Sequence, residues 1–332
     1  MLKKGEIMMK KLFSALLALT LCLSLAACGS KEATPQPSGD GKTFTVGICQ
    51  LAQHEALDAA TKGFRDALEE ALPGQVTFDE LNASGDIPTC ATICNGFAAS
   101  NVDLIMANAT PALQAAVSAT QTIPVLGTSV TEYGVALDIE NFNGTPGGNV
   151  SGTSDLAPLD QQAAMFDELL PEVDHVGILY CSAEANSAYQ VEVVKEALES
   201  AGKTVNLYTF ADSNDVASVT AQACSDCEAL YIPTDNTAAN CAEAINNVAE
   251  PAGIPIIAGE ESLCKGCGIA TLSIDYYELG RTTGEMAAKI LKGEADISEM
   301  AVEYYQNPVK KFFAERCEAL HIDVPSAYEA IG

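Results

Sequence analysis

The chain has 332 residues, of which 48% are hydrophobic and 6% aromatic, and its formal net charge is -28 at pH 7. At about 150 residues per domain, this length predicts two lobes, each with a core of its own. The acidic balance argues against nucleic-acid binding, because few basic side chains are available to neutralise phosphates.

Residues 1–27 have the pattern of a signal peptide. Lysines precede an apolar run that is too short to span a bilayer comfortably. The run ends in "LAAC", which resembles the bacterial lipobox and predicts lipidation (palmitate) of Cys28; a plain secretory peptide with an incidental cysteine is the alternative. Residues 28–42, rich in Gly, Ser and Pro, predict a flexible tether. The folded part is therefore expected to be exported and lipid-anchored on the outer face of the cytoplasmic membrane, at the cell surface or in the periplasm.

From residue 43 onward, short β-rich runs alternate with amphipathic stretches. In the segment 54–72, for example, Leu57, Phe64 and Leu68 recur along one face, which predicts a helix. The first series is expected to form strands at 44–51, 75–81, 102–110 and 123–130, and helices at 54–72, 88–100 and 111–120.

The pattern restarts after a Gly- and Asn-rich stretch at 141–154, which we interpret as a connection between lobes. The second series is expected to form helices at 159–171, 188–202, 213–224 and 237–253, and strands at 175–181, 203–210, 228–233, 254–259 and 268–274. A helix at 278–292, a weak strand near 302–305 and a short C-terminal helix follow.

Two βα series predict an α/β protein with two Rossmann-like, doubly wound parallel-sheet lobes and a cleft between them. We expect the first lobe to comprise residues 43–152 with about 276–300. The second lobe is expected to comprise residues 153–275 with about 301–332.

Polar side chains follow the strands at one end of both predicted sheets, where ligands bind in open parallel sheets. The candidate ligand-binding residues are Gln50, His54, Thr110, Ser129, Thr131, Ser182, Glu184, Asn186, Asp235, Asn236, Glu260 and Asp275. Helix capping is the alternative for each of them taken singly, but the whole set exceeds what caps require. Carboxylates suit an ammonium and helix N-terminal amides suit a carboxylate, so the set indicates a small zwitterion such as an α-amino acid.

Six motifs together resemble the extracytoplasmic substrate-binding lipoproteins of ABC transporters, in the branch associated with tryptophan, tyrosine or phenylalanine. They are "QHEALDAATKGF" (53–64), "ATPALQAA" (109–116), "PGGNVSGTSDL" (146–156), "SAEANS" (182–187), "YIPTDNT" (231–237) and "SIDYYELG" (273–280). The resemblance covers nearly the whole chain after the signal peptide. It implies the type I periplasmic-binding fold, two lobes joined by three crossovers that close on an amino acid, with a permease and an ATPase as partners and no cofactor.

The chain departs from this family in the loop after its first strand, where Gln53-His54-Glu55 stands in place of the Glu-His-Pro of many relatives. Because the loop loses one carboxylate, we favour Glu184, Asp235 or Asp275 as the partner of the ligand ammonium. The residues expected at the ligand carboxylate are Thr110, Ser129 and Thr131. Aromatic residues that either stack on the ligand or belong to the core are Tyr133, Phe142, Tyr189 and Tyr276.

Ten cysteines follow Cys28, and four of them form two Cys-x-x-Cys pairs, at 224–227 and 264–267. Two such pairs formally suit a tetrahedral zinc site, but their convergence does not follow from the sequence. An exported protein of this size needs no disulfide to fold. Disulfides, free thiols and a metal site therefore stay open as alternatives, and no metal ligand is assigned.

Two other functions stay open. A hydrolase would need His54 with Cys49 or Cys181 as the nucleophile, yet the chain has no Gly-x-Ser-x-Gly elbow, Walker loop or Gly-x-Gly-x-x-Gly after the first strand, so no catalytic residue is assigned. A ligand-sensing ectodomain of a membrane receptor would have the same fold and cleft as a transport protein, and the sequence does not separate the two.

Overall fold

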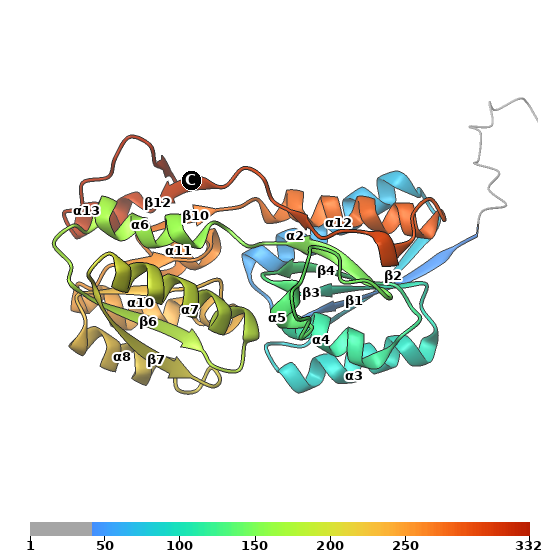
Figure 1. Cartoon of the computed structure of the whole chain (residues 1–332), viewed down its shortest axis with the longest axis horizontal. Coiled ribbons are helices and arrows are strands. Elements are labelled where there is room, and N and C mark those ends of the chain that lie inside the picture. Colours follow the sequence, from blue (N-terminus) through green and yellow to red (C-terminus); the bar gives the residue numbers. More distant parts are fainter. Residues whose placement is uncertain (1–41) are drawn as a thin grey trace, which may run out of the picture. The chain divides into compact units, whose positions relative to one another are not determined.

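The computed structural model of the chain describes residues 42–332 (Figure 1). The expected signal peptide, the lipidation site Cys28 and nearly all of the tether lie outside the described residues. Within residues 42–332, no helix combines the length and the apolar character that crossing a bilayer requires.

The first sheet contains, within the described chain, six parallel strands in the order β11-β5-β4-β3-β1-β2. Its strands are β1 (Phe44–Gln50), β2 (Val76–Asn82), β3 (Leu104–Asn108), β4 (Val125–Val130), β5 (Val150–Ser154) and β11 (Glu303–Tyr304). The helices that belong to this lobe are α2 (Glu55–Ala71), α3 (Ile87–Ser100), α4 (Thr110–Ala119), α5 (Tyr133–Ala136) and α12 (Tyr276–Leu291), with the 3-10 turn η1 (Ile297–Glu299).

The second sheet has the order β13-β12-β10-β9-β8-β6-β7 in the described part of the chain, and only β12 runs antiparallel to its neighbour β10. Its strands are β6 (His175–Cys181), β7 (Thr204–Phe210), β8 (Ala229–Ile232), β9 (Ile256–Ala258), β10 (Ala270–Ser273), β12 (Val309–Phe312) and β13 (Glu329–Ala330). Its helices are α6 (Leu159–Leu169), α7 (Ala185–Ser200), α8 (Val216–Asp226), α9 (Asn236–Asn240), α10 (Ala242–Ala252), α11 (Glu261–Cys267) and α13 (Ala314–Ala319).

Each sheet is packed on both faces, so each lobe has two apolar clusters. The central strands have almost no exposed residue; all five residues of β3, for example, are buried. Phe64 and Leu104 belong to the cluster on one side of the first sheet, and Phe97 and Ile105 to the cluster on the other. A strand that is apolar on both faces has to be covered on both, which confirms the predicted doubly wound fold.

Close helix packing fixes the start of α2, which reaches the cleft. A Cβ on Gly63 of α2 would lie 2.0 Å from the carbonyl oxygen of Tyr277, and a Cβ on Gly280 of α12 would lie 2.0 Å from that of Ala60. Only glycine permits this backbone approach. The two helices therefore lie against each other, and His54 is held at the N-terminus of α2.

The strand pairing differs from the expected lobe boundaries at two points. Strand β5 continues to Ser154 inside the first sheet, and β11 pairs with β5, although we placed residues 153–154 and 301 onward in the second lobe. Glycine makes β5 look like a linker, but Gly152 (φ 147°) is required there, because a Cβ would lie 2.0 Å from the carbonyl oxygen of Gly127. The chain thus crosses between the sheets after β5, between β10 and α12, and between β11 and β12.

Candidate ligand-binding cleft

A small cavity lies where the carboxyl ends of the strands of both sheets meet. Its lining residues are His54, Leu57, Ser129, Thr131, Asp155, Asn186, Thr234, Asp235, Asn236, Ala239, Glu260 and Tyr276. Its free volume of about 10 Å³ for the centre of a water-sized sphere is about what a single water molecule needs. A molecule larger than water therefore enters only when the walls of the cavity part.

The first-lobe wall contains strained backbone. Ala109, between β3 and α4, has φ 93° and ψ 156°, and Ser129, near the end of β4, has φ 54°. Residues other than glycine adopt such conformations at a cost of about 1–3 kcal/mol, and they cluster at functional sites. The strain aims Ser129 at the cavity and places Thr110 at the beginning of α4.

Asp155 directly follows β5, at the first crossover, and is 4% exposed. Its Oδ2 accepts a hydrogen bond from the Tyr276 hydroxyl at 3.0 Å, while its Oδ1 has no partner among the described residues. Burial, the largest cause, and nearby Glu260 raise the pKa of Asp155, hydrogen bonds from Thr131 and Tyr276 lower it, and the net result is a pKa of about 6. Asp155 is therefore a buried acid with one oxygen still available for a cation.

The second lobe places two carboxylates at the cavity, Asp235 in its lining and Glu184 behind Asn236, and both are already saturated with hydrogen bonds. Glu184 accepts hydrogen bonds from the backbone N–H groups of Asn236 (3.1 Å) and Thr237 (2.9 Å) and from both of their side chains. Asp235 accepts from the N–H of Cys181 (2.7 Å) and the Ser187 hydroxyl (2.8 Å) with Oδ2, and from the N–H of Ala238 with Oδ1. Both acids thus satisfy the first turn of α9.

The other two candidate acids are also caps. Glu260 caps α11 by accepting from the N–H groups of Ser262 (2.6 Å) and Leu263 (2.5 Å). Asp275 caps α12 by accepting from the N–H of Glu278 at 3.1 Å. Burial and the adjacent Glu184 raise the pKa of Asp235 to about 7.

Seven buried side-chain polar atoms of the described chain lack a hydrogen-bond partner: His54 Nδ1, Asn108 Oδ1, Thr110 Oγ1, Ser129 Oγ, Asp155 Oδ1, Asn186 Oδ1 and Thr271 Oγ1. Buried polar groups are normally paired, and each exception calls for an explanation. Four of the seven belong to residues that line the one small cavity. Their convergence marks the cavity as a place for a polar ligand.

The structure brings together seven of the twelve sequence-predicted site residues as cavity lining: His54, Ser129, Thr131, Asn186, Asp235, Asn236 and Glu260. The other five lie outside the lining: Gln50, Thr110, Ser182, Glu184 and Asp275. Gln50 is buried and hydrogen-bonded to Asp58 and to Thr61, each within 2.7 Å, and the Ser182 hydroxyl donates to the Phe210 carbonyl at 3.3 Å. As ligand contacts, all twelve stay predictions.

Among the cavity-lining residues that the predicted set did not include, Asp155 is the only carboxylic acid. Because residues 141–154 were interpreted as a connection, the residue after β5 was not considered as the end of a strand. The signal was nevertheless available, since an acid follows a run of small residues in "SGTSD". Among the four candidate aromatic residues, Tyr276 lines the cavity, whereas Tyr133 is fully buried and donates to the Thr153 carbonyl.

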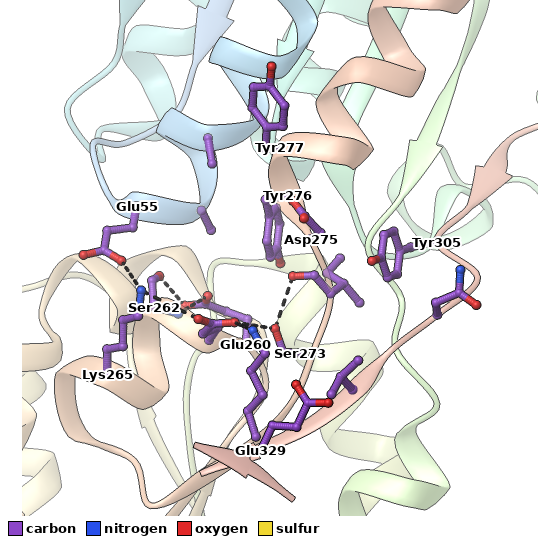
Figure 2. A pocket seen from close by; sticks show the side chains of 17 residues that line it. Glu55, Glu260, Ser262, Lys265, Ser273, Asp275, Tyr276, Tyr277, Tyr305 and Glu329 are labelled. Atoms are coloured by element: carbon purple, nitrogen blue, oxygen red, sulfur yellow. Dashed lines mark hydrogen bonds and ion pairs between the residues drawn. The ribbon is translucent and has the colours of Figure 1, made fainter. Parts of the chain in front are cut away.

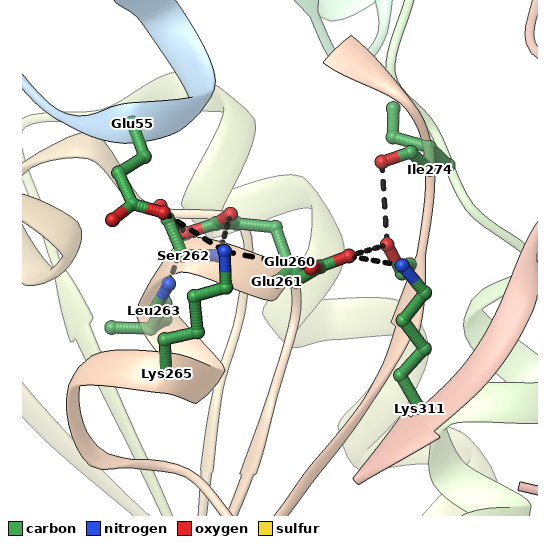
Figure 3. Close-up of polar contacts among 9 residues, drawn as sticks. Glu55, Glu260, Glu261, Ser262, Leu263, Lys265, Ile274 and Lys311 are labelled. Carbon is green, nitrogen blue, oxygen red and sulfur yellow. Dashed lines mark hydrogen bonds and ion pairs between the residues drawn. The ribbon is translucent and has the colours of Figure 1, made fainter. Parts of the chain in front are cut away.

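A larger hollow of about 440 Å³ adjoins the cavity and shares Glu260 and Tyr276 with it (Figure 2). Both lysines that line the hollow form ion pairs with glutamates of its lining (Figure 3). Lys265 Nζ of α11 lies 3.1 Å from Glu55 Oε2 of α2, and Lys311 Nζ lies 2.7 Å from Glu261 Oε2. The Lys265–Glu55 pair joins helices of the two lobes beside the cavity.

The ten described cysteines are free thiols, which corresponds to one of the three alternatives left open by the sequence. Cys49, at the end of β1, lies beside Cys90 and Cys94 of α3, and these neighbours and burial raise its pKa. Burial raises the pKa of Cys181 to about 11. Both thiols are therefore protonated near neutral pH and are weak nucleophiles. Within residues 42–332, no group of three or more His, Cys, Asp or Glu side chains is arranged to hold a metal ion.

Comparison with known proteins gives consistent matches over most of the chain. A family model described as ABC transporter substrate binding protein matches residues 45–324. A tyrosine-binding protein of Clostridioides difficile (strain R20291) is 34% identical over 298 residues, which cover 86% of this chain and 85% of that protein.

Two solved structures allow a comparison of conformations. An ABC domain of Streptococcus pneumonia in complex with L-Trp is 31% identical, with a TM-score of 0.83 over 87% of this chain and 100% of that one. The ligand-free, open structure of a Clostridium difficile substrate-binding protein with adhesive properties is 34% identical, with a TM-score of 0.66 over 87% of this chain and 99% of that one. At similar identity, the chain matches the Trp complex more closely than the open form.

Proposed function

This chain belongs to the ABC transporter substrate-binding protein family, and from that premise we propose that it captures an aromatic α-amino acid in the cavity between its lobes. The names of the relatives, one tyrosine-binding and one in complex with L-Trp, support this ligand class. The observation that carries the proposal is the convergence of four unpaired buried polar atoms on one closed cavity.

In this proposal the ligand ammonium binds Asp155. The Oδ1 atom of Asp155 is a buried, unpaired acceptor on a group that carries negative charge at neutral pH. Asn186 supplies a second acceptor, because its Nδ2 already donates to Glu184 and to the Thr234 carbonyl and leaves Oδ1 free to accept. A primary ammonium carries three N–H donors and one positive charge, which match this pair of acceptors.

The ligand carboxylate binds at the other unpaired groups of the first lobe. Ser129 Oγ, in the cavity lining, and Thr110 Oγ1, outside it, are hydroxyls without partners among the described residues. Thr110 begins α4, a helix whose N-terminal N–H groups favour an anion. These hydroxyls and the N-terminus of α4 are thus suited to a carboxylate. Thr131, which also lines the cavity, belongs to the same group of residues.

Capture involves opening and closing of the lobes about the three crossovers. The cavity is too small for an amino acid to enter in the closed arrangement. A ligand held by Asp155 of one lobe and Asn186 of the other favours closure, since neither lobe alone supplies both groups. The closed, loaded protein then delivers its cargo to a permease driven by an ATPase.

We further propose that a signal peptide exports the chain and that a lipid on Cys28 anchors it to the outer face of the membrane. The lipobox-like "LAAC" and the tether-like composition of residues 28–42 support this. Replacing Cys28 by Ser in the producing cell should release the protein into the soluble extracytoplasmic fraction. Retention of the variant in the membrane fraction would refute anchoring through this residue.

Calorimetry tests the ligand class directly. The panel contains L-Tyr, L-Trp and L-Phe, together with tyramine, which lacks the carboxylate, and 3-(4-hydroxyphenyl)propionate, which lacks the ammonium. Glucose and adenosine represent other ligand classes. A cognate amino acid at 100 times its dissociation constant should stabilise the protein by about 2.7 kcal/mol, and both truncated ligands should bind far more weakly. Binding of a sugar or nucleoside, with silence from every amino acid, would overturn the proposal.

A further inference from the structure

His54 and Asn236 form a polar contact across the cavity, from the N-terminus of α2 in the first lobe to that of α9 in the second. His54 Nε2 lies 3.4 Å from Asn236 Oδ1. The orientation of the Asn236 amide is fixed from behind, because its Nδ2 donates to Glu184 Oε2 at 2.7 Å and its backbone N–H donates to the same oxygen at 3.1 Å.

This arrangement determines which nitrogen of the His54 ring carries the proton. A carboxylate accepts only, so the Asn236 atom that faces Glu184 is the NH2 group and the atom that faces His54 is the carbonyl oxygen. That oxygen also accepts only, so His54 Nε2 donates. In the neutral ring Nδ1 then carries a lone pair. His54 Nδ1 is buried and has no partner among the described residues.

The surroundings of His54 differ from those of the charged part of the cavity. Leu57 lies one turn after His54 on α2, and Ala239 lies one turn after Asn236 on α9; both line the cavity. Asp155 and Tyr276, by contrast, lie beside the crossovers. The helix corner thus combines two apolar side chains with the unpaired acceptor of His54. The other unpaired acceptor near Asn236 is Asn186 Oδ1, whose amide donates to the same Glu184 oxygen and which the proposed function assigns to the ligand ammonium.

Building on the proposed function, we propose that His54 determines specificity: its Nδ1 accepts a hydrogen bond from the polar group of an aromatic ligand side chain, the phenol O–H of tyrosine or the indole N–H of tryptophan. The Glu184–Asn236 relay keeps the ring in the accepting tautomer. Phenylalanine offers no such donor, and it leaves the buried lone pair unsatisfied. The site therefore rejects phenylalanine although its ring is the same size as that of tyrosine.

The test measures the affinities of L-Tyr, O-methyl-L-tyrosine, L-Trp and L-Phe for the purified protein and for the variant His54→Phe. Wild-type protein should bind L-Tyr or L-Trp roughly tenfold more tightly than L-Phe, as expected for one good hydrogen bond to a buried acceptor. His54→Phe should lose this discrimination, with weaker binding of L-Tyr and L-Trp and an L-Phe affinity within roughly twofold of the wild-type value. The exposed neighbour supplies the control, Gln53→Ala, which should change none of the four affinities.

A second measurement reports the tautomer without relying on affinity. The 15N chemical shifts of His54 should identify Nε2 as protonated and Nδ1 as the acceptor in the ligand-bound protein, and Asn236→Leu should weaken that preference. Equal loss of all four ligands in His54→Phe would overturn the inference, because His54 would then act on the shared amino-acid part or on the fold. Unchanged discrimination would overturn it as well. If wild-type protein binds no amino acid, the proposed function itself fails.

Discussion

The two lobes meet at the cavity with the same strand-to-helix architecture, yet they hold their carboxylates in opposite ways. The first-lobe wall has strained backbone at Ala109 and Ser129 and an unpaired oxygen on Asp155. In the second lobe, the carboxylates of Glu184 and Asp235 accept hydrogen bonds from the N-terminus of α9. A buried carboxylate near a cleft therefore indicates a ligand-binding site only if its hydrogen bonds within the protein leave an oxygen atom unpaired.

The largest expected effect comes from Asp155→Asn, which should separate binding from stability. Loss of the charged partner should weaken amino-acid binding by about 2–5 kcal/mol. The ligand-free protein should become more stable by up to about 3 kcal/mol, because a pKa raised from 3.8 to about 6 reflects about two units at 1.36 kcal/mol each. Calorimetry and thermal unfolding of one preparation measure both. A variant that binds normally would remove Asp155 from the site.

Asp235→Ala should show the reverse behaviour. The substitution leaves the N–H groups of Cys181 and Ala238 buried without acceptors, at about 1–3 kcal/mol for each unsatisfied group. Removal of a carboxyl group whose pKa is raised to about 7 offsets part of this cost, so we expect a net loss of unfolding free energy in denaturant titrations and a smaller loss of ligand affinity than in Asp155→Asn. If stability were unchanged and binding abolished, Asp235 would be the partner of the ligand and Asp155 would not.

The pH dependence of binding provides an intermediate effect. In the ligand-free protein the pKa of Asp155 is about 6, and an ammonium beside the carboxylate would lower it. The ligand therefore binds with its full affinity well above pH 6, where the carboxyl group is charged, and its affinity falls as the pH decreases below 6. Between pH 7 and pH 5 the loss should be about tenfold, one pH unit below the free-state pKa. Glu260, Thr131 and Tyr276 face the same carboxyl group. The slope should vanish in Asp155→Asn, and a slope that persists there would assign it to another group.

The smallest effect should come from the ion pair beside the cavity. Glu55→Gln removes one of the two acidic partners of Lys265, the other being Glu261. The Glu55 side chain is 69% exposed, and exposed pairs contribute about 0–1 kcal/mol. Affinity should change by less than about fivefold at physiological salt. A much larger change in titration calorimetry would mean that this pair, rather than the ligand, holds the lobes together.

The elements could be predicted from the sequence because their signals are local. Buried strands such as β3 and β6 are continuous apolar runs, and the apolar face of α2 repeats with helical spacing. Strand β5 was missed because its glycine and hydroxyl residues resemble a linker; it is a strand because Gly127 and Gly152 allow two backbones to approach. That approach arises only when the two strands pair in the folded sheet, so no local sequence signal reports it.

The site was only partly predictable for a related reason. Glu184 was a reasonable ligand partner in the sequence because an acid beside an amide follows a strand. Its actual partners, Asn236 and Thr237, lie more than 50 positions away and begin a different helix. Whether an acid is free or saturated depends on such long-range contacts, and a single sequence does not report them.

The hydrogen bond between Tyr276 and Asp155 has a mechanical consequence. It connects the first crossover to the start of α12, which directly follows the second crossover. The carboxylate that would hold the ligand ammonium therefore belongs to the hinge that bends when the lobes separate. A bound ammonium would stiffen that hinge, and the residence time of the ligand would depend on how easily the crossover segments twist. A transporter subunit that pulls on either lobe could then shorten the residence time without touching the ligand.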